Sequence, residues 1–537
     1  MATKTKWRRL CGVGLLALTV ALTHVAADAA SPMVFRRGNQ AEPSTLDPHQ
    51  AGSAWENNII GDLFLGLTTE DINGKPIPGA AESWTTSADG LLWTFKLRPG
   101  LVWSDGVPLK ASDFVFGFRL LLDPKTAALY ASIQYAIKNA QEINSGKLPP
   151  DQVGVRALDN HTIEIELAAP TPFLPGLLTH YTSFPIPEHA YKKYGKDWIK
   201  PGNMVSNGPY TLVDWKAHEE IKLVKNPLFY DAKNVAIDEV YYYPTDDQNA
   251  ALSRFRAGEL DANIGTRAFA TSQYAFIKEN LPGQSHVDPM LGSEYIALNT
   301  RRPPFSDQRL RKAVSLCLDR EVLIDKVLRD GQLPAYSFVP PGIDNYHSTA
   351  RVDFAGQPIA QRQAEAKKLL AEAGYTADKP FSFEYMYMIS IDSRRSVVAQ
   401  SAMLKACGMI VRLVGNEPKI HYDAMRQADF IAAQARWGAD YNDPQTFLYL
   451  LDSRSGAYNY GGYNNALYDQ LSDQAKTTLD LEQRASILGR AEQIALDETA
   501  VVPMSFFTSR SLVAPYVKGF VGNVVDVNRT RWMRIER

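Results

Sequence analysis

The order of sequence patterns predicts a mixed α/β fold for this chain. Segments with strand-like and helix-like spacing of apolar residues alternate from end to end, rather than gathering in separate halves. The chain has 537 residues, which is more than one hydrophobic core supports, so we expect two or three domains. Apolar residues make up 45% of it and charged residues 22%, which is typical of a folded protein rather than a disordered one.

Strands are predicted where apolar residues alternate with polar ones. Ile163, Ile165 and Leu167 occupy every second position of residues 161–170, which puts them on one face of a strand. Three other short apolar segments are predicted as strands: 220–227, 239–245 and 501–507.

Helices are predicted between these strands. Residues 361–373 place Ala366, Leu369, Leu370 and Ala373 on one helical face, and Gly374 follows as a C-terminal cap. Residues 482–497 repeat the pattern with Ile487, Ala491 and Ile494. We find no short repeat and no low-complexity linker.

The first 29 residues are predicted to be a cleaved secretory signal. Four basic residues precede an apolar run over 12–22, which is too short to span a bilayer, and Ala-Asp-Ala at 27–29 suits cleavage. An uncleaved N-terminal anchor helix is the alternative. Removal of 29 of the 537 residues leaves 508. The segment carries four basic residues and one acidic residue, so the net charge would change from −2 to about −5.

The cysteines favour a protein without a lipid anchor. Cys11 precedes the apolar run, and no cysteine follows the cleavage site until Cys317, whereas a lipoprotein needs one directly after its signal. We therefore expect a soluble periplasmic protein. Export permits a disulfide between Cys317 and Cys407. Both lie in segments predicted as helical, so two separate buried thiols are an equal alternative.

No sequence signature of catalysis is present. The chain has no HExxH, GxSxG, Walker A, GxGxxG or CxxC motif, and its nine histidines show no metal-binding spacing. The mildly acidic mature chain lacks the basic runs of a nucleic-acid-binding protein. The WSDG segment, with Trp93, Trp103, Asp105, Gly106 and Asp113, is interpreted as a turn and a packed edge.

Residues 430–444, FIAAQARWGADYNDP, form the strongest candidate binding segment. In an extended strand Arg436, Gly438 and Asp440 share one face, and Trp437 points to the other. A carboxylate enclosed in a groove is costly unless it meets a cation. A peptide offers an ammonium group, carboxylates and a backbone that can pair with a strand. The plainer alternative is that Asp440 caps the following turn.

The same segment resembles the peptide-holding strand of periplasmic oligopeptide-binding proteins, the receptors of ABC peptide importers. The resemblance covers nearly the whole mature chain and rests on several ordered blocks: 81–84 (AESW), 93–116 (WTFKLRPGLVWSDGVPLKASDFVF), 206–215 (SNGPYTLVDW), 286–289 (HVDP) and 367–380 (KKLLAEAGYTADKP).

The resemblance implies a two-lobed, type II-like periplasmic binding protein with an extra inserted third domain. Ligand would lie between two lobes that close on it. The expected division is as follows: domain I at 30–65, 185–291 and 506–537; domain II at 66–184; domain III at 292–505.

The resemblance also implies roles for individual residues. Asp440 would bind the peptide α-ammonium, while Gly438, Ala439 and their neighbours would pair with the peptide backbone. Trp437 would line a side-chain pocket, with core packing as the alternative. Tyr130 and Tyr295 match tyrosines that flank the peptide, and each is equally compatible with a core position.

Departures from the family pattern suggest a narrower ligand. Broad-specificity members carry cations that hold peptide C-termini at several distances, whereas this chain has Gln434, Asp392 and Leu328 at those positions, Asp392 on a looser match. Arg436 stands where those members have Gly, and Ala297 where they have Glu.

A gained cation and a lost anion favour a ligand carboxylate close to the N-terminus, held by a bidentate Arg436. This pair resembles receptors for murein tripeptide, L-Ala-γ-D-Glu-meso-diaminopimelate, whose D-Glu α-carboxylate is free. The alternative is that Arg436 pairs with an acid such as Asp440 or Asp443. The family's cysteine pair is replaced by Gly292 and Gly438.

We therefore predict a non-enzymatic, monomeric periplasmic receptor without a cofactor or metal. It would deliver a short peptide, with murein tripeptide favoured, to an inner-membrane ABC permease. A receptor for ordinary di- to pentapeptides is the first alternative. A periplasmic peptidase or amidase, and a chaperone or haem-binding role on the same fold, are alternatives of other classes.

Overall fold

The structure is a computed structural model that describes residues 31–329, 331–439 and 441–537. The expected signal peptide over 1–29 and the predicted ligand residue Asp440 both lie outside the described residues. Residues Met33–Arg537 form the unit that carries the sheets and both hydrophobic cores.

The strands of this unit are β1 Val34–Gly38, β2 Thr68–Glu70, β3 Pro76–Pro78, β4 Ala81–Thr86, β5 Leu92–Leu97, β6 Val155–Ala157, β7 Thr162–Glu166, β8 Tyr210–Lys216, β9 Glu220–Lys225, β10 Glu239–Tyr243, β11 Ala262–Asn263, β12 Ser285–Leu298, β13 Leu333–Pro334, β14 Phe381–Met388, β15 Met409–Asn416, β16 Ala432–Gly438, β17 Val501–Val513, β18 Val517–Lys518 and β19 Arg534–Ile535.

The α-helices are α1 Ala54–Leu63, α2 Ala111–Leu122, α3 Ala140–Asn144, α4 Leu174–Leu177, α5 Glu188–Tyr194, α6 Gln248–Arg256, α7 Tyr274–Asn280, α8 Gln308–Cys317, α9 Arg320–Val322, α10 Ile359–Glu372, α11 Ile391–Ala406, α12 Pro418–Arg426, α13 Gln445–Leu448, α14 Ala466–Thr477 and α15 Leu481–Asp497.

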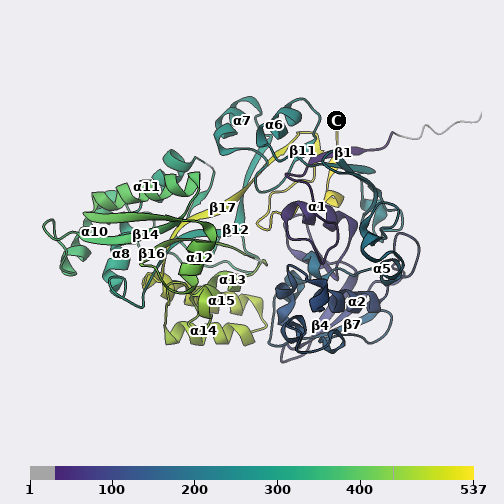
Figure 1. Cartoon of the computed structure of the whole chain (residues 1–537), viewed down its shortest axis with the longest axis horizontal. Helices are drawn as coiled ribbons and strands as arrows, with labels where there is room; N and C mark the ends of the chain where they lie inside the picture. Colours follow the sequence, from purple (N-terminus) through teal and green to yellow (C-terminus); the bar gives the residue numbers. More distant parts are fainter. Residues whose placement is uncertain (1–30, 330, 440) are drawn as a thin grey trace, which may run out of the picture. The chain divides into compact units, whose positions relative to one another are not determined.

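One mixed sheet runs through the unit in the order β15-β14-β16-β12-β17-β11-β1-β10-β9-β8, with β13 paired to β17. Its two longest strands, β12 and β17, are antiparallel neighbours (Figure 1). Their ladder is irregular between Pro289 and Ser293 and again between Glu294 and Tyr295. A separate four-stranded sheet has the order β4-β5-β7-β6.

Two hydrophobic cores lie along this sheet. The first core joins residues between Phe35 and Ile277 to others between Leu512 and Met533. The second joins residues between Leu291 and Met504. We call the segments that build them the first lobe (33–290 and 507–537) and the second lobe (291–506). The division into three domains stays a prediction, although the separate sheet lies within the segment predicted as the insertion.

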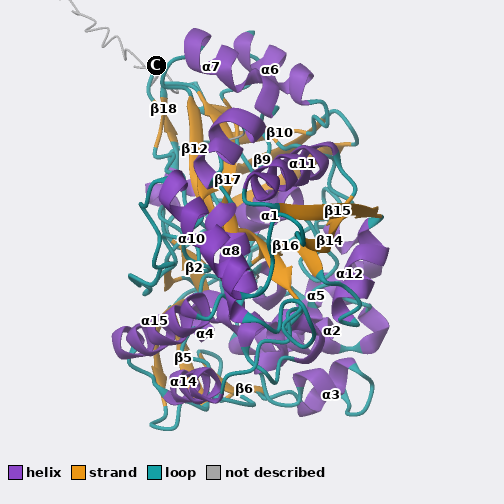
Figure 2. Ribbon diagram, turned by 90° about the vertical axis from the view of Figure 1, so that its left-hand side faces the viewer, coloured by secondary structure: helices purple, strands orange, loops and turns teal. Residues whose placement is uncertain are grey.

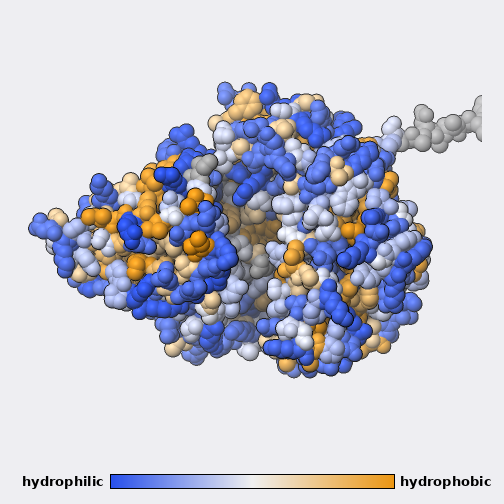
Figure 3. All heavy atoms as spheres, in the orientation of Figure 1, coloured by the Kyte–Doolittle hydropathy of each residue, from blue (hydrophilic) through white to orange (hydrophobic). Residues whose placement is uncertain are grey.

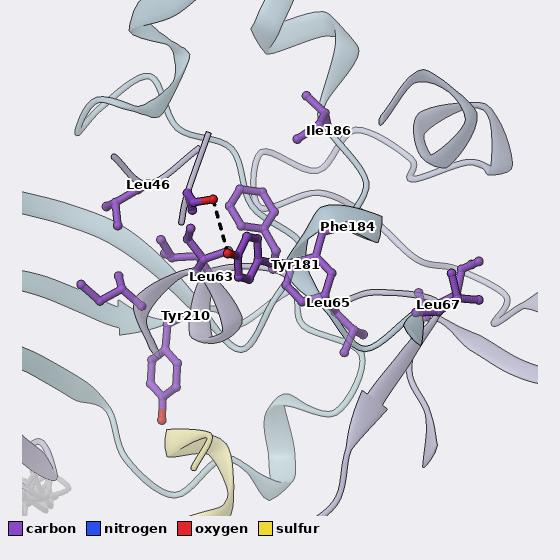
Figure 4. Close-up of a cluster of buried hydrophobic side chains, with 14 of the residues drawn as sticks. Leu46, Leu63, Leu65, Leu67, Tyr181, Phe184, Ile186 and Tyr210 are labelled. Carbon is purple, nitrogen blue, oxygen red and sulfur yellow. Dashed lines mark hydrogen bonds between the residues drawn. The ribbon is translucent and has the colours of Figure 1, made fainter. Parts of the chain in front are cut away.

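Helices cover the second lobe's part of the sheet and complete its core. Figure 2 shows α8, α10 and α11 beside the strands of this lobe, with α14 and α15 as a further pair. Figure 4 shows part of the first core, where side chains far apart in sequence, such as Leu46, Tyr181 and Tyr210, come together. The Tyr181 hydroxyl donates to the Ala51 carbonyl at 3.3 Å, so the ring is buried without an unpaired phenol.

The predicted secondary structure is confirmed at each segment named above. Ile163 and Ile165 fall in β7 and Leu167 directly follows it, while β9, β10 and β17 form where strands were expected. The two predicted helices are α10 and α15, and Gly374 ends the first of them with φ of +86°. Ala366, Leu370, Ile487 and Ala491 are buried, as their spacing predicted.

Cys317 and Cys407 form a disulfide, with their Cα atoms 6.4 Å apart. The bond joins the last residue of α8 to the residue that follows α11. The sequence left this pairing open, because periodicity shows that a cysteine lies on a buried face but not which buried cysteine it meets.

Candidate functional site

Strand β16 positions the predicted binding residues. The small side chains of Ala432, Ala433 and Ala435 let it pack deep in the sheet, where each is fully buried. On one side it pairs with β12 over its whole length, and on the other with β14 only at Ala432 and Ala433. Among the described strands, none pairs with that second edge beyond Ala433, and exposure of the strand rises toward Gly438.

A cavity of about 330 Å³ lies where β16 ends. Gly438, Ala439, Tyr441 and Asn442 of the second lobe line one side of it. Its other walls belong to the first lobe and to the crossing strands, and include Ser53, Asn57, Glu70, Tyr130, His180, Leu291 and Phe507. Figure 3 shows a hollow in the surface between the two lobes. A molecule held there would contact both lobes at once.

The glycines at 292 and 438 have different physical roles. They are direct partners across the β12–β16 ladder. A Cβ on Gly292 would come within 2.0 Å of the Phe507 ring, so the aromatic side chain occupies the space that a cysteine would need. A Cβ on Gly438 would meet nothing within 4 Å, because this residue borders the cavity. Because residue 292 is glycine and not cysteine, the Phe507 ring has room in the cavity wall.

His180 brings a neutral hydrogen-bond donor to the cavity. Burial, together with the charge of Arg529, lowers the pKa of His180 to about 3, so the ring is uncharged at neutral pH. The backbone N–H of Thr182 donates to Nδ1 at 3.3 Å, which places the ring proton on Nε2. No described residue accepts from Nε2. No periodicity or motif in the sequence singles out this histidine.

An internal ion pair neutralises the first-lobe wall. Arg529 contacts Glu70 at 3.1 Å, and both side chains are nearly fully buried. The same guanidinium donates to the Asn57 carbonyl at 2.8 Å. Because Glu70 already has its cation, it is not free to bind a ligand ammonium group.

Arg436 is held by an acid that the sequence analysis did not name. Its Nε donates to Glu294 Oε2 at 2.7 Å, and Gln434 Nε2 donates to Glu294 Oε1 at 2.9 Å. Glu294 and Arg436 face each other across the β12–β16 ladder. The Glu294 charge raises the pKa of Arg436. Arg436 therefore does form an internal ion pair, which was the predicted alternative. Its partner is Glu294 and not the suggested Asp443.

Asp443 belongs to a different pair. It accepts two hydrogen bonds from Arg484, at 2.6 and 2.8 Å, with both side chains buried. The Arg484 guanidinium also lies over the Phe173 ring, 5.3 Å from its centroid. Phe173 in turn stacks on Tyr441, with ring centroids 4.8 Å apart and planes 4° from parallel. This stack joins the first lobe to the cavity-lining segment of the second.

Five of the predicted ligand residues do not border the cavity: Arg436 and Trp437, which are partly exposed, and three that are buried. Tyr295, Ala297 and Gln434 are buried to within 3% exposure and do not border it. Tyr295 packs edge-on against Phe338 at 5.0 Å in the second core, which is the core alternative that the sequence left open. Gln434 instead donates a hydrogen bond to Glu294. Tyr130 does line the cavity and is 37% exposed.

Trp437 lies on the face of β16 opposite to Arg436 and is partly exposed. Its indole N–H donates to the Thr446 hydroxyl at 3.2 Å, and its ring meets Tyr458 at 6.0 Å. Of the positions that depart from the family pattern, Leu328 is buried, whereas Asp392 is exposed and lies 3.7 Å from Arg395. Neither borders the cavity.

The WSDG segment is structural, as predicted. Trp103 is buried and its indole N–H donates to Asp113, while Gly106 has φ of +86° in the turn. Across the described ranges, no group of three or more His, Cys, Asp or Glu residues is arranged to hold a metal ion. Within the same ranges no helix combines the length and apolarity that crossing a membrane requires.

Comparison with known proteins agrees with this architecture. Residues 75–459 match the bacterial extracellular solute-binding proteins, family 5, middle region. The periplasmic oligopeptide-binding protein OppA of Escherichia coli (strain K12) is 38% identical over 539 residues, covering 98% of each chain.

Two solved structures that are similar to this chain differ in whether a peptide is bound. The unliganded open form of MppA, a periplasmic murein tripeptide binding protein, has a TM-score of 0.89 at 34% identity, covering 94% of this chain and 98% of that one. Haemophilus influenzae OppA in complex with the peptide RPPGFSPFR has a TM-score of 0.70 at 36% identity, covering 94% and 99%.

The fold is thus that of a two-lobed periplasmic binding protein with an extra domain. Its arrangement is more similar to the open, unliganded form than to the peptide complex. Identity to the oligopeptide-binding proteins is no lower than identity to MppA, so overall similarity does not favour the murein-tripeptide prediction. The chain belongs to family 5 of the bacterial extracellular solute-binding proteins and is a periplasmic binding protein, not an enzyme.

Proposed function

We propose that this protein is the peptide-binding receptor of an ABC importer. The cavity between the lobes carries the proposal, because strand β16 reaches it at Gly438 and one edge of the strand pairs with no described strand over Arg436–Gly438. An extended peptide can pair its backbone with such an edge. Closure of the two lobes would then remove water from around it. The oligopeptide-binding relatives support the same class of ligand.

The peptide α-ammonium would bind Asp440. The two chain neighbours of this residue, Ala439 and Tyr441, both line the cavity. Glu70, an acid among the described lining residues, is already paired with Arg529. The neutral His180 would donate its Nε2 proton to a peptide carbonyl or carboxylate, and Tyr130 would cover the ligand from the first lobe.

Within this class, murein tripeptide is the narrower proposal. Arg436 uses Nε for Glu294, while its two terminal nitrogens have no partner among the described residues. Its side chain is 31% exposed. The free edge of the guanidinium would hold a carboxylate next to the peptide N-terminus by two parallel hydrogen bonds. The free D-Glu carboxylate of murein tripeptide has that position.

A receptor for ordinary oligopeptides is the second candidate, and the Glu294–Arg436 contact favours it. The carboxylate balances the arginine charge, so the pair as a whole is neutral and gains less from a second anion. A receptor of this kind would bind tri-alanine well without any carboxylate at the second residue.

Titration calorimetry on ligand-stripped protein tests both the peptide-binding function and the narrower choice of murein tripeptide as ligand. The Asp440→Asn variant should lose about ten- to a hundredfold in affinity for any bound peptide, since a charge-assisted hydrogen bond contributes about 1.5–3 kcal/mol. Asp429→Asn is the matched control, because Asp429 precedes the other end of β16 and is exposed. Equal affinity of the Asp440→Asn variant and the wild type would refute the ammonium site.

The narrower proposal is tested by titrating murein tripeptide and tri-alanine in parallel. Tight binding of murein tripeptide with weak binding of tri-alanine supports it. The reverse preference supports the oligopeptide receptor and makes Arg436 a structural partner of Glu294.

A further inference from the structure

A second hollow lies on the second lobe and shares no lining residue with the cavity between the lobes. Its volume is about 690 Å³, and we call it the outer pocket. Its walls come from the ends of α10 and α11 and from the starts of β14 and β15. Strand β15 is the last in the order of the large sheet. Figure 1 shows α10 and α11 at the end of the second lobe that is farther from the first lobe.

The floor of the outer pocket is apolar and held in place. Leu370, Phe381 and Met409 line it and belong to the second core. The Tyr375 ring packs against Phe381, with ring centroids 4.9 Å apart. Cys407 lines the pocket as well, and its disulfide ties this end of α11 to α8. A surface that is formed before binding costs little conformational freedom when a ligand occupies it.

The apolar lining continues into exposed positions. Ile410, the second residue of β15, lines the pocket and is 55% exposed. Ala371 and Ala406 also line it and are exposed. A Cβ added to Gly408 would meet nothing within 4 Å, so the pocket is open above this residue. Apolar side chains exposed within a concave surface are typical of a ligand site.

Two lysines make the lining positive. Lys367 of α10 and Lys405 of α11 border the pocket, and the described lining residues include no Asp or Glu. Neither ammonium group has a hydrogen-bond or ion-pair partner among the described residues. A cation in the last turn also stabilises a helix end, which accounts for Lys405. It does not account for Lys367, which lies more than one turn before the end of α10.

We propose that the outer pocket binds an amphipathic carboxylate, namely a straight-chain fatty acid. The chain would lie on the apolar floor, and Lys367 and Lys405 would donate charge-assisted hydrogen bonds to the carboxylate. Apolar floor and unpaired cations together select this chemistry, because a neutral apolar ligand would leave the lysines unused and an amphipathic cation would be repelled by them. The site is separate from the proposed peptide site and does not depend on it.

Titration calorimetry with octanoate, decanoate and dodecanoate, each below its micelle concentration, tests the apolar part of the site. Affinity should rise about tenfold from each acid to the next, which is two methylenes longer. Dodecyltrimethylammonium has the same chain length and the opposite charge. It should bind about tenfold more weakly than dodecanoate.

Two variants test the named residues. Lys367→Gln/Lys405→Gln should lose about five- to tenfold in affinity for dodecanoate, because two exposed ion pairs are removed. Ala371→Phe should weaken dodecanoate binding by a similar factor, because the added ring occupies the pocket. Lys368→Gln/Lys419→Gln is the matched control for charge, since both lysines are exposed on the second lobe and neither lines the pocket.

The remaining measurements separate the outer pocket from the cavity between the lobes. Dodecanoate should bind equally well when a peptide that binds in calorimetry is present at saturation, and peptide affinity should be the same in all the variants. Thermal unfolding of each variant checks that the fold is intact. The proposal is overturned if none of the three acids binds, if dodecyltrimethylammonium binds as tightly as dodecanoate, or if peptide displaces dodecanoate. Equal affinity for dodecanoate in the Lys367/Lys405 variant and in its charge control also overturns it.

Discussion

The positive charge of Arg436 is already balanced by a carboxylate of the neighbouring strand, that of Glu294. The residue occupies the face that strand alternation predicts, but the decisive contact is with Glu294, which lies 142 positions earlier in the chain. Sequence analysis of a single strand identifies which side chains share a face. It does not show which residues of a neighbouring strand lie opposite, because that depends on the register of the β12–β16 ladder.

Replacement of Glu294 tests how much this pair contributes to stability. In Glu294→Gln the Arg436 charge loses its carboxylate while most of the side chain stays buried, so we expect the free energy of unfolding to fall by about 1–3 kcal/mol. Urea denaturation measures the change. The same substitution should strengthen the binding of any ligand that carries a carboxylate next to its N-terminus, because it frees the arginine charge.

Glu384→Gln is the control for that experiment. Glu384 is also a second-lobe carboxylate paired with an arginine, Arg412, but the arginine is 73% exposed. Exposed ion pairs contribute about 0–1 kcal/mol, so this variant should unfold almost as the wild type does. Equal effects of the two substitutions would show that the Glu294 pair behaves as a surface contact.

Glu492 gives the second lobe a dependence on pH. Burial raises the pKa of Glu492 from its ordinary 4.5 to about 7, although Tyr346 and two backbone N–H groups donate to it. The unfolded chain therefore releases this proton at a lower pH than the folded protein does. The stability that this group contributes is full below pH 4.5 and is lost as the pH rises to about 7.

A comparison with Glu492→Gln isolates this effect, because the variant cannot titrate at that position. The difference in unfolding free energy between variant and wild type should grow in the variant's favour, by up to about 3 kcal/mol, between pH 4.5 and 7. Urea denaturation at several pH values measures it. Other titrating groups, such as His180, cancel in the difference. A difference that does not change with pH would mean that the folded protein keeps Glu492 ionised.

Elements were easier to predict than contacts between them. Periodicity located β7, α10 and α15, because amphipathic spacing depends on residues close together in the chain. It failed to separate ligand-facing from core positions in β12, where Tyr295 and Ala297 share the burial of their neighbours. A strand inside a mixed sheet is covered on both faces, so alternation no longer distinguishes a groove from a core.

The disulfide joins two helical elements, and sequence analysis left open whether it forms. Cys317 and Cys407 close a loop of 90 residues between the ends of α8 and α11. A loop of that length is expected to stabilise the fold by about 2–5 kcal/mol, chiefly by restricting the unfolded chain. The double variant Cys317→Ser/Cys407→Ser should therefore unfold at lower urea concentration.

Neither cysteine borders the cavity at the end of β16, so peptide affinity of the double variant should stay unchanged. The control is wild-type protein treated with reductant, whose stability should fall to that of the variant. A variant as stable as the oxidised wild type would show that the crosslink does not constrain the unfolded chain in this way.

At the scale of the whole unit, the crossing strands β12 and β17 connect the two lobes. Their ladder is interrupted between Pro289 and Ser293, at the place where the chain passes from the first lobe to the second. A hinge needs a few residues whose dihedral angles can change without breaking a continuous ladder. The aromatic stack of Phe173 on Tyr441 joins the lobes away from this point, beside the cavity.

These features predict that ligand binding closes the lobes. The described arrangement matches an unliganded open relative at a TM-score of 0.89 and a peptide complex at only 0.70, although the sequence identities are similar. Small-angle X-ray scattering should therefore show a larger radius of gyration for ligand-stripped protein than for protein saturated with a peptide that binds in calorimetry. Asp440→Asn at the same peptide concentration should keep the larger value, because it lacks the carboxylate proposed to bind the ligand. An unchanged radius in the saturated wild type would mean that the bulges of β12 do not act as a hinge and that the peptide binds to the open form.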